Sequence, residues 1–514
     1  MTAAIAAATF TAVAATVLAD IRWLRVAQRE HYLAGSVTRF ALRWWRLGPN
    51  RLLGAAAVLG VVLSPISPFT GLIGALAIAV GPFRYAVRGR SPGPVVWTAR
   101  LKNVAALTAG VQSVLVAAGI VLGAAVPVAS VVALLTPLII DGALRGLSPL
   151  EARRASTFVD QARARLEEIK PTIVGITGSY GKTTTKVYAA HLMSGGRRAV
   201  PTPASFNNTA GLSRAINEHL VPGTEVFVAE MGTYGKGEIA DMCSWCPPRV
   251  AAITAIGPVH LERFITEDAI VVAKSEILET ADIVVLNVDD PRLAAVADRQ
   301  AAAGKRVVRC SVVDPLADVS VRTSADGRLD VSLGGSHLAS VEAPDVSPGN
   351  VAVAVALALS VDVPPAMVAA GLQSLPPVAN RRAEVVLSTG ATAVDDTFNS
   401  NPAGCRAALA ALSRLGAPGG SRVVVTPGMV ELGPSQAPEN TAFATLAATT
   451  ATHLVIVGFT NRAALLAGAM SVPAEERAQL LFADIHERAV DWVRANTSAG
   501  DVVLYEGQLP DHYP

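Results

Sequence analysis

The chain has 514 residues, enough for about three folding units at the usual ~150 residues per domain. Only 16% of the residues are charged and 51% are hydrophobic, whereas soluble proteins carry about 25% charged residues, so we expect part of the chain to lie in lipid. The net charge of +2 gives no support for a nucleic acid partner, and four cysteines are too few for a disulfide framework.

Residues 1–146 alternate between uncharged apolar runs and basic stretches. The uncharged runs are 2–19, 52–83 and 103–140, and turn-forming residues interrupt the last two. Because a membrane-spanning helix needs about 20 apolar residues, we predict a helical transmembrane domain with one span and two hairpins, five spans in all. The positive-inside rule places the basic stretches, and everything after them, in the cytosol. The alternative is a helical domain buried within a soluble protein.

A charged amphipathic stretch follows the third apolar run. Ser148, Pro149 and Glu151 have the pattern of a helix N-cap, a proline at the first helical position and a glutamate at the third. We therefore predict a separate linker helix over residues 147–170, between the bilayer and the rest of the chain.

A phosphate-binding loop is predicted after the linker. Residues 171–178 form a β-branched run that ends in glycine, as buried strands do, and residues 187–193 read as a helix. The segment between them holds a glycine loop followed by Lys182 and Thr183, although Ile176 stands where the strict GxxxxGKT spacing needs glycine. Such a loop closes backbone N–H groups on phosphate oxygens at a helix N-terminus. The expected nucleotide-binding residues are Gly178, Ser179, Gly181, Lys182, Thr183 and Thr184.

The loop GITGSYGKTTTK (175–186) resembles the ATP loop of the Mur ligases, and further segments follow in that family's order. They are SFNNTAG (205–211), VAEMG (228–232), GEI (237–239), ITAIGPVHLE (253–262), AKSEI (273–277), LNVDDP (286–291) and DDTFNSNP (395–402), the last close to the MurF type. The resemblance covers about residues 171–510. It implies an ATP-dependent ligase that joins a carboxylate to an amine through an acyl phosphate.

The resemblance also implies the metal-binding and catalytic residues. Two Mg²⁺ ions would be held by Thr183, Glu230, His260 and Lys274, and the family carbamylates the lysine that aligns with Lys274. Lys182, His260 and Lys274 are the implied catalytic residues. Without the resemblance, Glu230 is an ordinary strand end, His260 a loop or core histidine, and Lys274 a surface lysine on a helix over residues 268–280.

Several asparagines and one aspartate match the family's substrate and nucleotide positions. Asn207 and Asn208 would line the acceptor or phosphate side of the site. In the last domain, Asp396 would hold the ATP ribose, with Asn399 and Asn401 shaping the loop beside it. Because Asp and Asn clusters usually form turns, the alternative is that these residues only build loops.

The remaining matches are partial, and they bear on the substrate. Asn350 keeps one of the two asparagines of the family's adenine-side signature, and either Arg381 or Arg382 corresponds to a hinge arginine that touches phosphate. The family's N-terminal substrate domain is absent, and Glu506 replaces the lysine of a MurF-type K-G-S motif. We therefore expect an incoming amine or amino acid other than D-alanyl-D-alanine, and an acceptor that is lipid-linked or reached at the membrane.

The sequence thus predicts an N-terminal membrane domain followed by α/β domains. An ATP-binding Mur ligase central domain (171–375) should have a mostly parallel sheet, with short edge strands in 311–343 and a helix over 351–359. A Rossmann-like C-terminal domain (376–514) should have strands near 391–394, 422–426, 453–457 and 501–504. The active site is expected between these two domains, assembled by their closure.

We interpret the chain as a MurF-like ligase at the cytosolic side of the cell membrane, acting on a cell-envelope or secondary-metabolite substrate. Two alternatives stay open: a poly-γ-glutamate-type ligase that polymerises amino acids, and a non-catalytic nucleotide-sensing membrane subunit. The last would be expected to lose Lys182, Glu230, His260 or Lys274, and all four are present.

Overall fold

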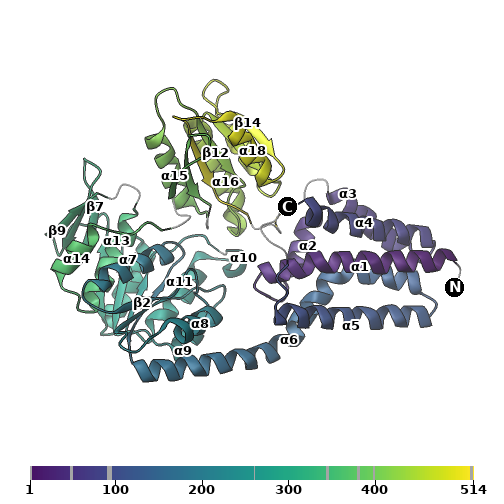
Figure 1. The fold of residues 1–514 in the computed structure, drawn as a ribbon, viewed down its shortest axis with the longest axis horizontal. Helices are drawn as coiled ribbons and strands as arrows, with labels where there is room; N and C mark the ends of the chain where they lie inside the picture. The colour runs from purple at the N-terminus through teal and green to yellow at the C-terminus, as the bar shows by residue number, and fades with distance from the viewer. Residues whose placement is uncertain are drawn as a thin grey trace.

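The computed structural model describes residues 3–46, 50–88, 95–259, 261–342, 346–378, 383–397, 400–509 and 513. The described chain forms an N-terminal helical module, a central domain around a nine-stranded sheet and a C-terminal domain around a six-stranded sheet (Figure 1). The predicted combination of apolar N-terminal helices with α/β domains is confirmed.

The helical module contains helices at each predicted apolar run. They are α1 (Ala3–Arg29), α2 (Ser36–Arg46), α3 (Asn50–Leu63), α4 (Pro68–Arg88), α5 (Ala99–Val121) and the first part of α6 (Ala125–Ile169). Within the described residues, three helices (α1, α5 and α6) are long and apolar enough to cross a membrane, or four if α2 and α3 form one broken span. The count of five spans therefore stays a prediction.

Helices α3 and α4 form the predicted hairpin, and glycines bring their backbones together. A Cβ atom on Gly60 would lie 2.5 Å from the backbone nitrogen of Gly74, so no side chain fits between the helices there. Large apolar side chains such as Leu52 and Phe69 point outward and are exposed. Close backbone contact inside and apolar groups outside is the arrangement of helices packed in lipid.

The prediction of a separate linker helix is wrong. Helix α6 runs from Ala125 to Ile169 without a break, and Pro149 lies inside it. An internal proline removes one helical hydrogen bond, but the far end of the helix is stabilised by packing. Ala162 and Leu166 are buried in the core of the central domain, and Arg165 donates hydrogen bonds to the Leu220 carbonyl at 2.9 and 3.1 Å. One continuous rod therefore joins the module to the central domain (Figure 1).

The central sheet has the strand order β2-β3-β1-β4-β5-β6-β7-β8-β9. Its strands are β1 (Thr172–Thr177), β2 (Ala199–Pro201), β3 (Val226–Glu230), β4 (Val250–Ile253), β5 (Ile283–Asn287), β6 (Arg306–Ser311), β7 (Val319–Thr323), β8 (Leu329–Leu333) and β9 (Ser336–Val341). In this order, all neighbouring strands from β2 through β1 to β7 pair in parallel. The last strands, β7, β8 and β9, pair antiparallel. The predicted edge of short strands is confirmed.

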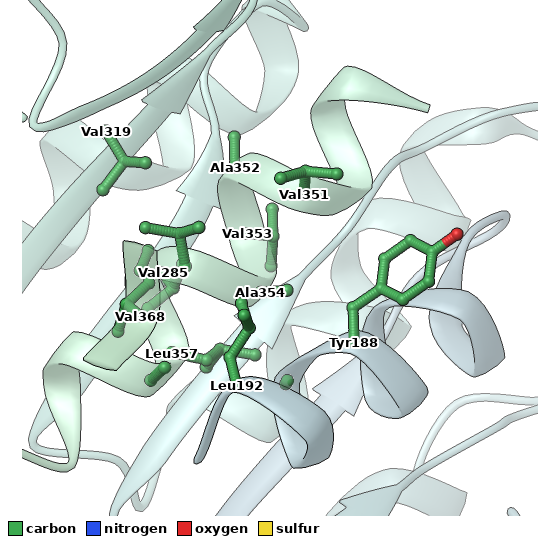
Figure 2. Packing of buried hydrophobic residues seen from close by; sticks show 14 of the residues in the cluster. Tyr188, Leu192, Val285, Val319, Val351, Ala352, Val353, Ala354, Leu357 and Val368 are labelled. Carbon is green, nitrogen blue, oxygen red and sulfur yellow. The ribbon is translucent and has the colours of Figure 1, made fainter. Parts of the chain in front are cut away.

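Helices cover both faces of this sheet, and each face has its own hydrophobic core. The helices are α7 (Lys182–Ser194), α8 (Thr209–His219), α9 (Glu238–Trp245), α10 (Leu261–Phe264), α11 (Glu267–Ser275), the 3-10 turn η1 (Glu276–Leu278), α12 (Pro291–Ala302), α13 (Pro348–Ser360) and α14 (Pro365–Leu372). Tyr188 and Leu192 of α7 lie beside Val353 and Leu357 of α13 (Figure 2). Helix α13, predicted despite its valines, is apolar on all sides and buried between α7 and the sheet.

The C-terminal sheet has the strand order β10-β11-β15-β12-β13-β14. Its strands are β10 (Ala383–Val386), β11 (Thr392–Asp396), β12 (Arg422–Thr426), β13 (His453–Val457), β14 (Gln479–Ala483) and β15 (Val502–Glu506), and its helices are α15 (Pro402–Leu415), η2 (Gly433–Ser435), α16 (Gln436–Thr450), α17 (Arg462–Met470) and α18 (His486–Asn496). The four predicted strands are confirmed. The sequence did not reveal β10 and β14, because they are edge strands whose apolar residues Val385, Val386 and Phe482 are exposed.

The α3–α4 contact provides a test of the helical module. Gly60→Ala should destabilise the detergent-solubilised chain by about 1–3 kcal/mol, because the new methyl group would overlap the backbone of α4. Gly110→Ala in α5 is the matched control: its Cβ would meet no atom within 4 Å, so the higher helix propensity of alanine should leave stability unchanged or raised by about 1 kcal/mol. Thermal unfolding measures both, and equal effects would contradict the close contact of α3 and α4.

Candidate active site

The phosphate loop connects the end of β1 to the start of α7. Both loop glycines adopt conformations and contacts that exclude side chains: φ is +152° at Gly178 and +79° at Gly181. A Cβ atom on Gly178 would lie 2.0 Å from Thr254 Oγ1, and one on Gly181 would lie 2.2 Å from Asn350 Oδ1. The structure therefore places Asn350, predicted to contact the nucleotide, directly against the loop.

The segment after β4 anchors the other side of the loop. The Ser179 N–H donates to the Ala255 carbonyl at 2.7 Å, and the Ser179 hydroxyl donates to the Gly257 carbonyl at 3.1 Å. The Gly257 N–H in turn donates to the Ser179 hydroxyl at 3.0 Å. The loop is therefore fixed to the backbone at Ala255 and Gly257.

Two lysines lie close to the loop. The Lys182 ammonium donates to the Gly178 carbonyl at 2.7 Å, which folds the side chain over the loop. Lys274 is 2% exposed at the end of α11. Burial, together with the positive charge of Lys182, lowers the pKa of Lys274 well below its usual value. The alternative of a surface lysine on a helix over residues 268–280 is wrong, because α11 ends at Ser275 and turns Lys274 into the protein.

Glu230 ends β3 beside the start of α7, and it is 1% exposed. The Thr183 hydroxyl lies 3.0 Å from Glu230 Oε2, and the Asn207 amide donates to Oε1 at 3.2 Å. The carboxyl end of β3, the helix N-terminus and the 202–208 loop therefore meet at one carboxylate. Three of the predicted site residues come together there.

Lys186 also contacts this carboxylate, and the sequence analysis gave it no role. Its ammonium donates to Glu230 Oε2 at 3.0 Å and to the Ala204 carbonyl at 2.5 Å, and the side chain is 2% exposed. A signal was present in the sequence, because Thr183 and Lys186 lie three positions apart on one helix. Residues three or four positions apart share a helix face. The partner of Lys186, however, lies 44 positions away along the chain.

Other predicted residues have structural contacts of their own. The Asn208 side chain caps α8 by accepting from the Gly211 N–H at 2.9 Å, and Asn401 caps α15 by accepting from the Gly404 N–H at 3.0 Å, as the turn alternative expected. Asp396 is 8% exposed at the end of β11. His260, Arg381, Arg382 and Asn399 lie outside the described residues, so their roles stay predictions.

Tyr180 of the phosphate loop interacts electrostatically with the C-terminal domain. Burial raises the pKa of Tyr180, and nearby negative charges, Glu267 first and then Glu439 of α16, add to the shift. Glu506, the residue that departs from the MurF-type motif, is fully buried at the end of β15. Its Oε1 accepts from the Ser400 hydroxyl at 2.5 Å and from the Cys405 thiol at 3.1 Å. The Glu506 carboxylate is therefore bound within its own domain.

Metal-binding capacity here depends on oxygen donors. In the part of the chain that the structure describes, no group of three or more His, Cys, Asp or Glu side chains is placed to hold a metal ion. The predicted set includes only Glu230 of these types among the described residues. The Glu230 carboxylate and the Thr183 hydroxyl are hard oxygen donors of the kind that Mg²⁺ prefers.

Comparison with known proteins agrees with this geometry. Residues 176–353 match the model of the Mur ligase middle domain, and residues 381–509 match that of the Mur ligase, glutamate ligase domain. The chain is 30% identical over 409 residues to the UDP-N-acetylmuramoyl-tripeptide--D-alanyl-D-alanine ligase of Mycobacterium leprae, which covers 71% of this chain and 78% of that protein. The chain belongs to the Mur ligase family.

Solved structures show the same fold. MurF from Acinetobacter baumannii has a TM-score of 0.59 at 25% identity, covering 69% of this chain and 77% of the other. MurF from Thermotoga maritima, solved in complex with ADP, has a TM-score of 0.56 at 24% identity, covering 70% and 81%. The predicted family, its MurF-like character and the fold are confirmed, and this Mur ligase is an ATP-dependent enzyme that forms an amide bond between a carboxylate and an amine.

The Lys186–Glu230 pair provides a test of the site. Lys186→Met should lower the free energy of unfolding of the full chain by about 3–5 kcal/mol, because it leaves the Glu230 charge buried without its cation. The matched control is Arg214→Met on α8, whose ion pair with Glu218 is exposed and should contribute under about 1 kcal/mol. Chemical denaturation in detergent measures the free energy of unfolding of both variants. Equal losses would show that the buried ion pair stabilises the fold no more than the exposed one.

Proposed function

We propose that this Mur ligase works at the cytosolic face of a cell membrane on a cell-envelope or secondary-metabolite acceptor. The acceptor carboxylate attacks the γ-phosphate of ATP and ADP leaves; the amine then attacks the acyl carbon, and phosphate leaves as the amide forms. The observation that carries the proposal is the contact between Thr183, at the start of α7, and the buried Glu230, in a domain joined to the apolar helices by one continuous helix. In the same domain the buried Lys274 feels the charge of Lys182.

The loop residues are proposed to hold the triphosphate of ATP. Gly178, Ser179 and Gly181 would offer backbone N–H groups, with Thr184 beside them in the first turn of α7. Lys182 already lies over the loop and would neutralise the β- and γ-phosphates. Asn350, which packs on Gly181, would contact the nucleotide, and Asp396 and one of Arg381 and Arg382 would reach it from the C-terminal domain.

Two Mg²⁺ ions are proposed to accompany ATP. Thr183 and Glu230 would hold one, and His260 and a carbamylated Lys274 would complete the second site. When bound, the ions supply the positive charge that lets a carboxylate approach a triphosphate. Asn207 keeps the Glu230 carboxylate in place through its amide, and Lys186 holds the same carboxylate from the other side.

Carbamylation of Lys274 fits its surroundings. An amine reacts with CO₂ only in its unprotonated form, and burial favours that form at this position. The product carries a negative charge, so the repulsion between Lys182 and a protonated Lys274 would be replaced by attraction. The modified side chain would offer oxygen donors where an unmodified lysine offers none to a cation.

The membrane location and the substrate are proposed from the helical module and from Glu506. Helices α1, α5 and α6 contain long apolar stretches, and large side chains such as Phe10, Val114 and Leu138 are exposed on them. An acceptor that is lipid-linked would bring its carboxylate to this face. Because an anion replaces the lysine of the MurF-type motif, the incoming amine is proposed to differ from the D-alanyl-D-alanine named for the relative.

Phosphate release tests the ligase. The full chain in lipid nanodiscs, given ATP, Mg²⁺, membrane extract and a panel of amino acids and dipeptides, should release phosphate only with both an extract and a matching amine. Lys182→Ala should reduce the rate at least about 100-fold, because a charge stabiliser is lost, whereas Arg214→Ala should retain it. Release that no amine stimulates would contradict ligase activity, and successive addition of glutamate would favour the polymerising alternative.

Carbamylation is testable by ¹³C NMR. After exchange with ¹³C-bicarbonate, the full chain should show one slowly exchanging carbamate resonance. Lys274→Arg should remove the resonance, because a guanidinium does not form the carbamate, and Lys305→Arg should retain it. A resonance that survives in Lys274→Arg would exclude Lys274 as its source.

A further inference from the structure

The three parts of the chain meet around helix α10. We call this contact the joint and define it by Glu30, Phe40, Arg43, Glu262, Arg263 and Tyr513. The first three residues belong to the helical module, the next two to α10, and the last to the C-terminal tail. Val430 and Leu509 of the C-terminal domain pack against the hydrophobic core of the helical module beside it.

Two ion pairs connect α10 to the helical module, and α10 supplies the anion in one and the cation in the other. Arg43 Nη2 lies 2.6 Å from Glu262 Oε1, and Arg263 Nη2 lies 3.3 Å from Glu30 Oε2. The four side chains are between 8% and 23% exposed, so salt screens them less than surface pairs. Because neighbouring residues of α10 carry opposite charges that meet opposite charges, a rotated or shifted α10 would bring like charges together.

Aromatic rings from all three parts fill the space around these ion pairs. Tyr234 of the central domain stacks on His31 with ring centres 5.9 Å apart, and the Arg263 guanidinium lies over Tyr234 at 4.4 Å. Tyr513 packs edge-on against Phe40 at 4.9 Å, and the Arg43 guanidinium lies 5.6 Å from the Tyr513 ring. Both arginines of the ion pairs therefore also bind an aromatic ring.

The backbone around the joint is held in an uncommon conformation. His31, Ile265 and Glu431 are non-glycine residues with φ of 55°, 69° and 65°, one from each part of the chain. Such conformations persist only where surrounding contacts hold them. The joint encloses a cavity of only about 10 Å³, room for a single water molecule, so it is a packed contact and not a ligand pocket.

Helix α10 is also adjacent to the proposed active site. It begins directly after His260, and α11, which follows it, carries Lys274. On the side of the C-terminal domain, a Cβ atom on Gly433 would lie 3.1 Å from Leu261, so the two backbones are in close contact. The position of α10 is thus set by the helical module and the C-terminal domain together.

We propose that Glu30 and Arg43 are positioning residues: the helical module orients α10, and with it the metal-binding segment, and Tyr513 docks the C-terminal domain at the same place. This inference rests on the proposed function, because the orientation of α10 matters to catalysis only if His260 and Lys274 belong to the active site. Amide formation then requires the helical module, although nucleotide binding by the phosphate loop does not.

Charge reversal across the Glu30–Arg263 pair tests the positioning role in the full chain in nanodiscs. Glu30→Arg and Arg263→Glu alone should each lower kcat for phosphate release at least about tenfold, with KM for ATP changed less than about twofold. The double variant should recover most of the wild-type kcat. The matched control is the same exchange in the exposed pair Arg214 and Glu218, which should change neither constant.

A distance measurement reports the joint without any turnover. The four native cysteines are buried, whereas Asp491 in α18 and Arg154 in α6 are exposed. A nitroxide reagent should therefore label the introduced cysteines of an Asp491→Cys, Arg154→Cys variant selectively. Pulsed electron resonance should give a narrow distance distribution for this pair. The distribution should broaden with Glu30→Arg or Tyr513→Ala and narrow again in the Glu30→Arg, Arg263→Glu double variant.

The possible outcomes distinguish failure of the positioning proposal from failure of the proposed ligase function. A distribution that stays narrow in every variant, or a double variant as slow as the single ones, would overturn the joint. A distribution that broadens and recovers as expected, in a protein that releases no phosphate with any amine, would leave the docking in place but remove its role in catalysis together with the proposed function.

Discussion

The central domain is organised around one carboxylate that is almost excluded from water. Glu230 sits at the carboxyl end of a buried strand, where its charge is tolerated because Lys186, Thr183 and Asn207 all contact it. Lys186 and Thr183 come from the first turns of α7, so the same contacts that stabilise the carboxylate also hold the helix behind the phosphate loop. Burial of one charge thus requires the strand, the loop and the helix to keep a single arrangement.

The second lysine of the site follows from the same packing. Lys274 is buried because α11 packs into the core on the α8 face of the sheet, and Lys182 lies near it because the loop folds back at the start of α7. Two cations placed together away from water are unfavourable unless one is neutral or becomes an anion. The negative charge of a nucleotide or of a carbamate on Lys274 would offset that repulsion, whereas a metal ion alone would add to it.

The helical module contributes more than attachment. Helix α6 runs without a break from the helical module to the central domain, and the joint connects α10 and the C-terminal tail to the same module. The end of α6 therefore contacts the central domain, and around α10 the helical module contacts both the central and the C-terminal domains. Any movement of the C-terminal domain that closes the predicted active site would therefore take place against the helical module.

The sequence alone determined what contiguous patterns can carry: the apolar runs, the phosphate loop, the α/β alternation and the family, because each depends on residues adjacent along the chain. It could not show that α6 passes through Pro149, since the packing of Leu166 that stabilises the far end is remote from the proline. Nor could it pair Lys186 with Glu230 or Arg263 with Glu30, which lie 44 and 233 positions apart. Those contacts arise only when tertiary packing brings distant segments together and removes water from their charges.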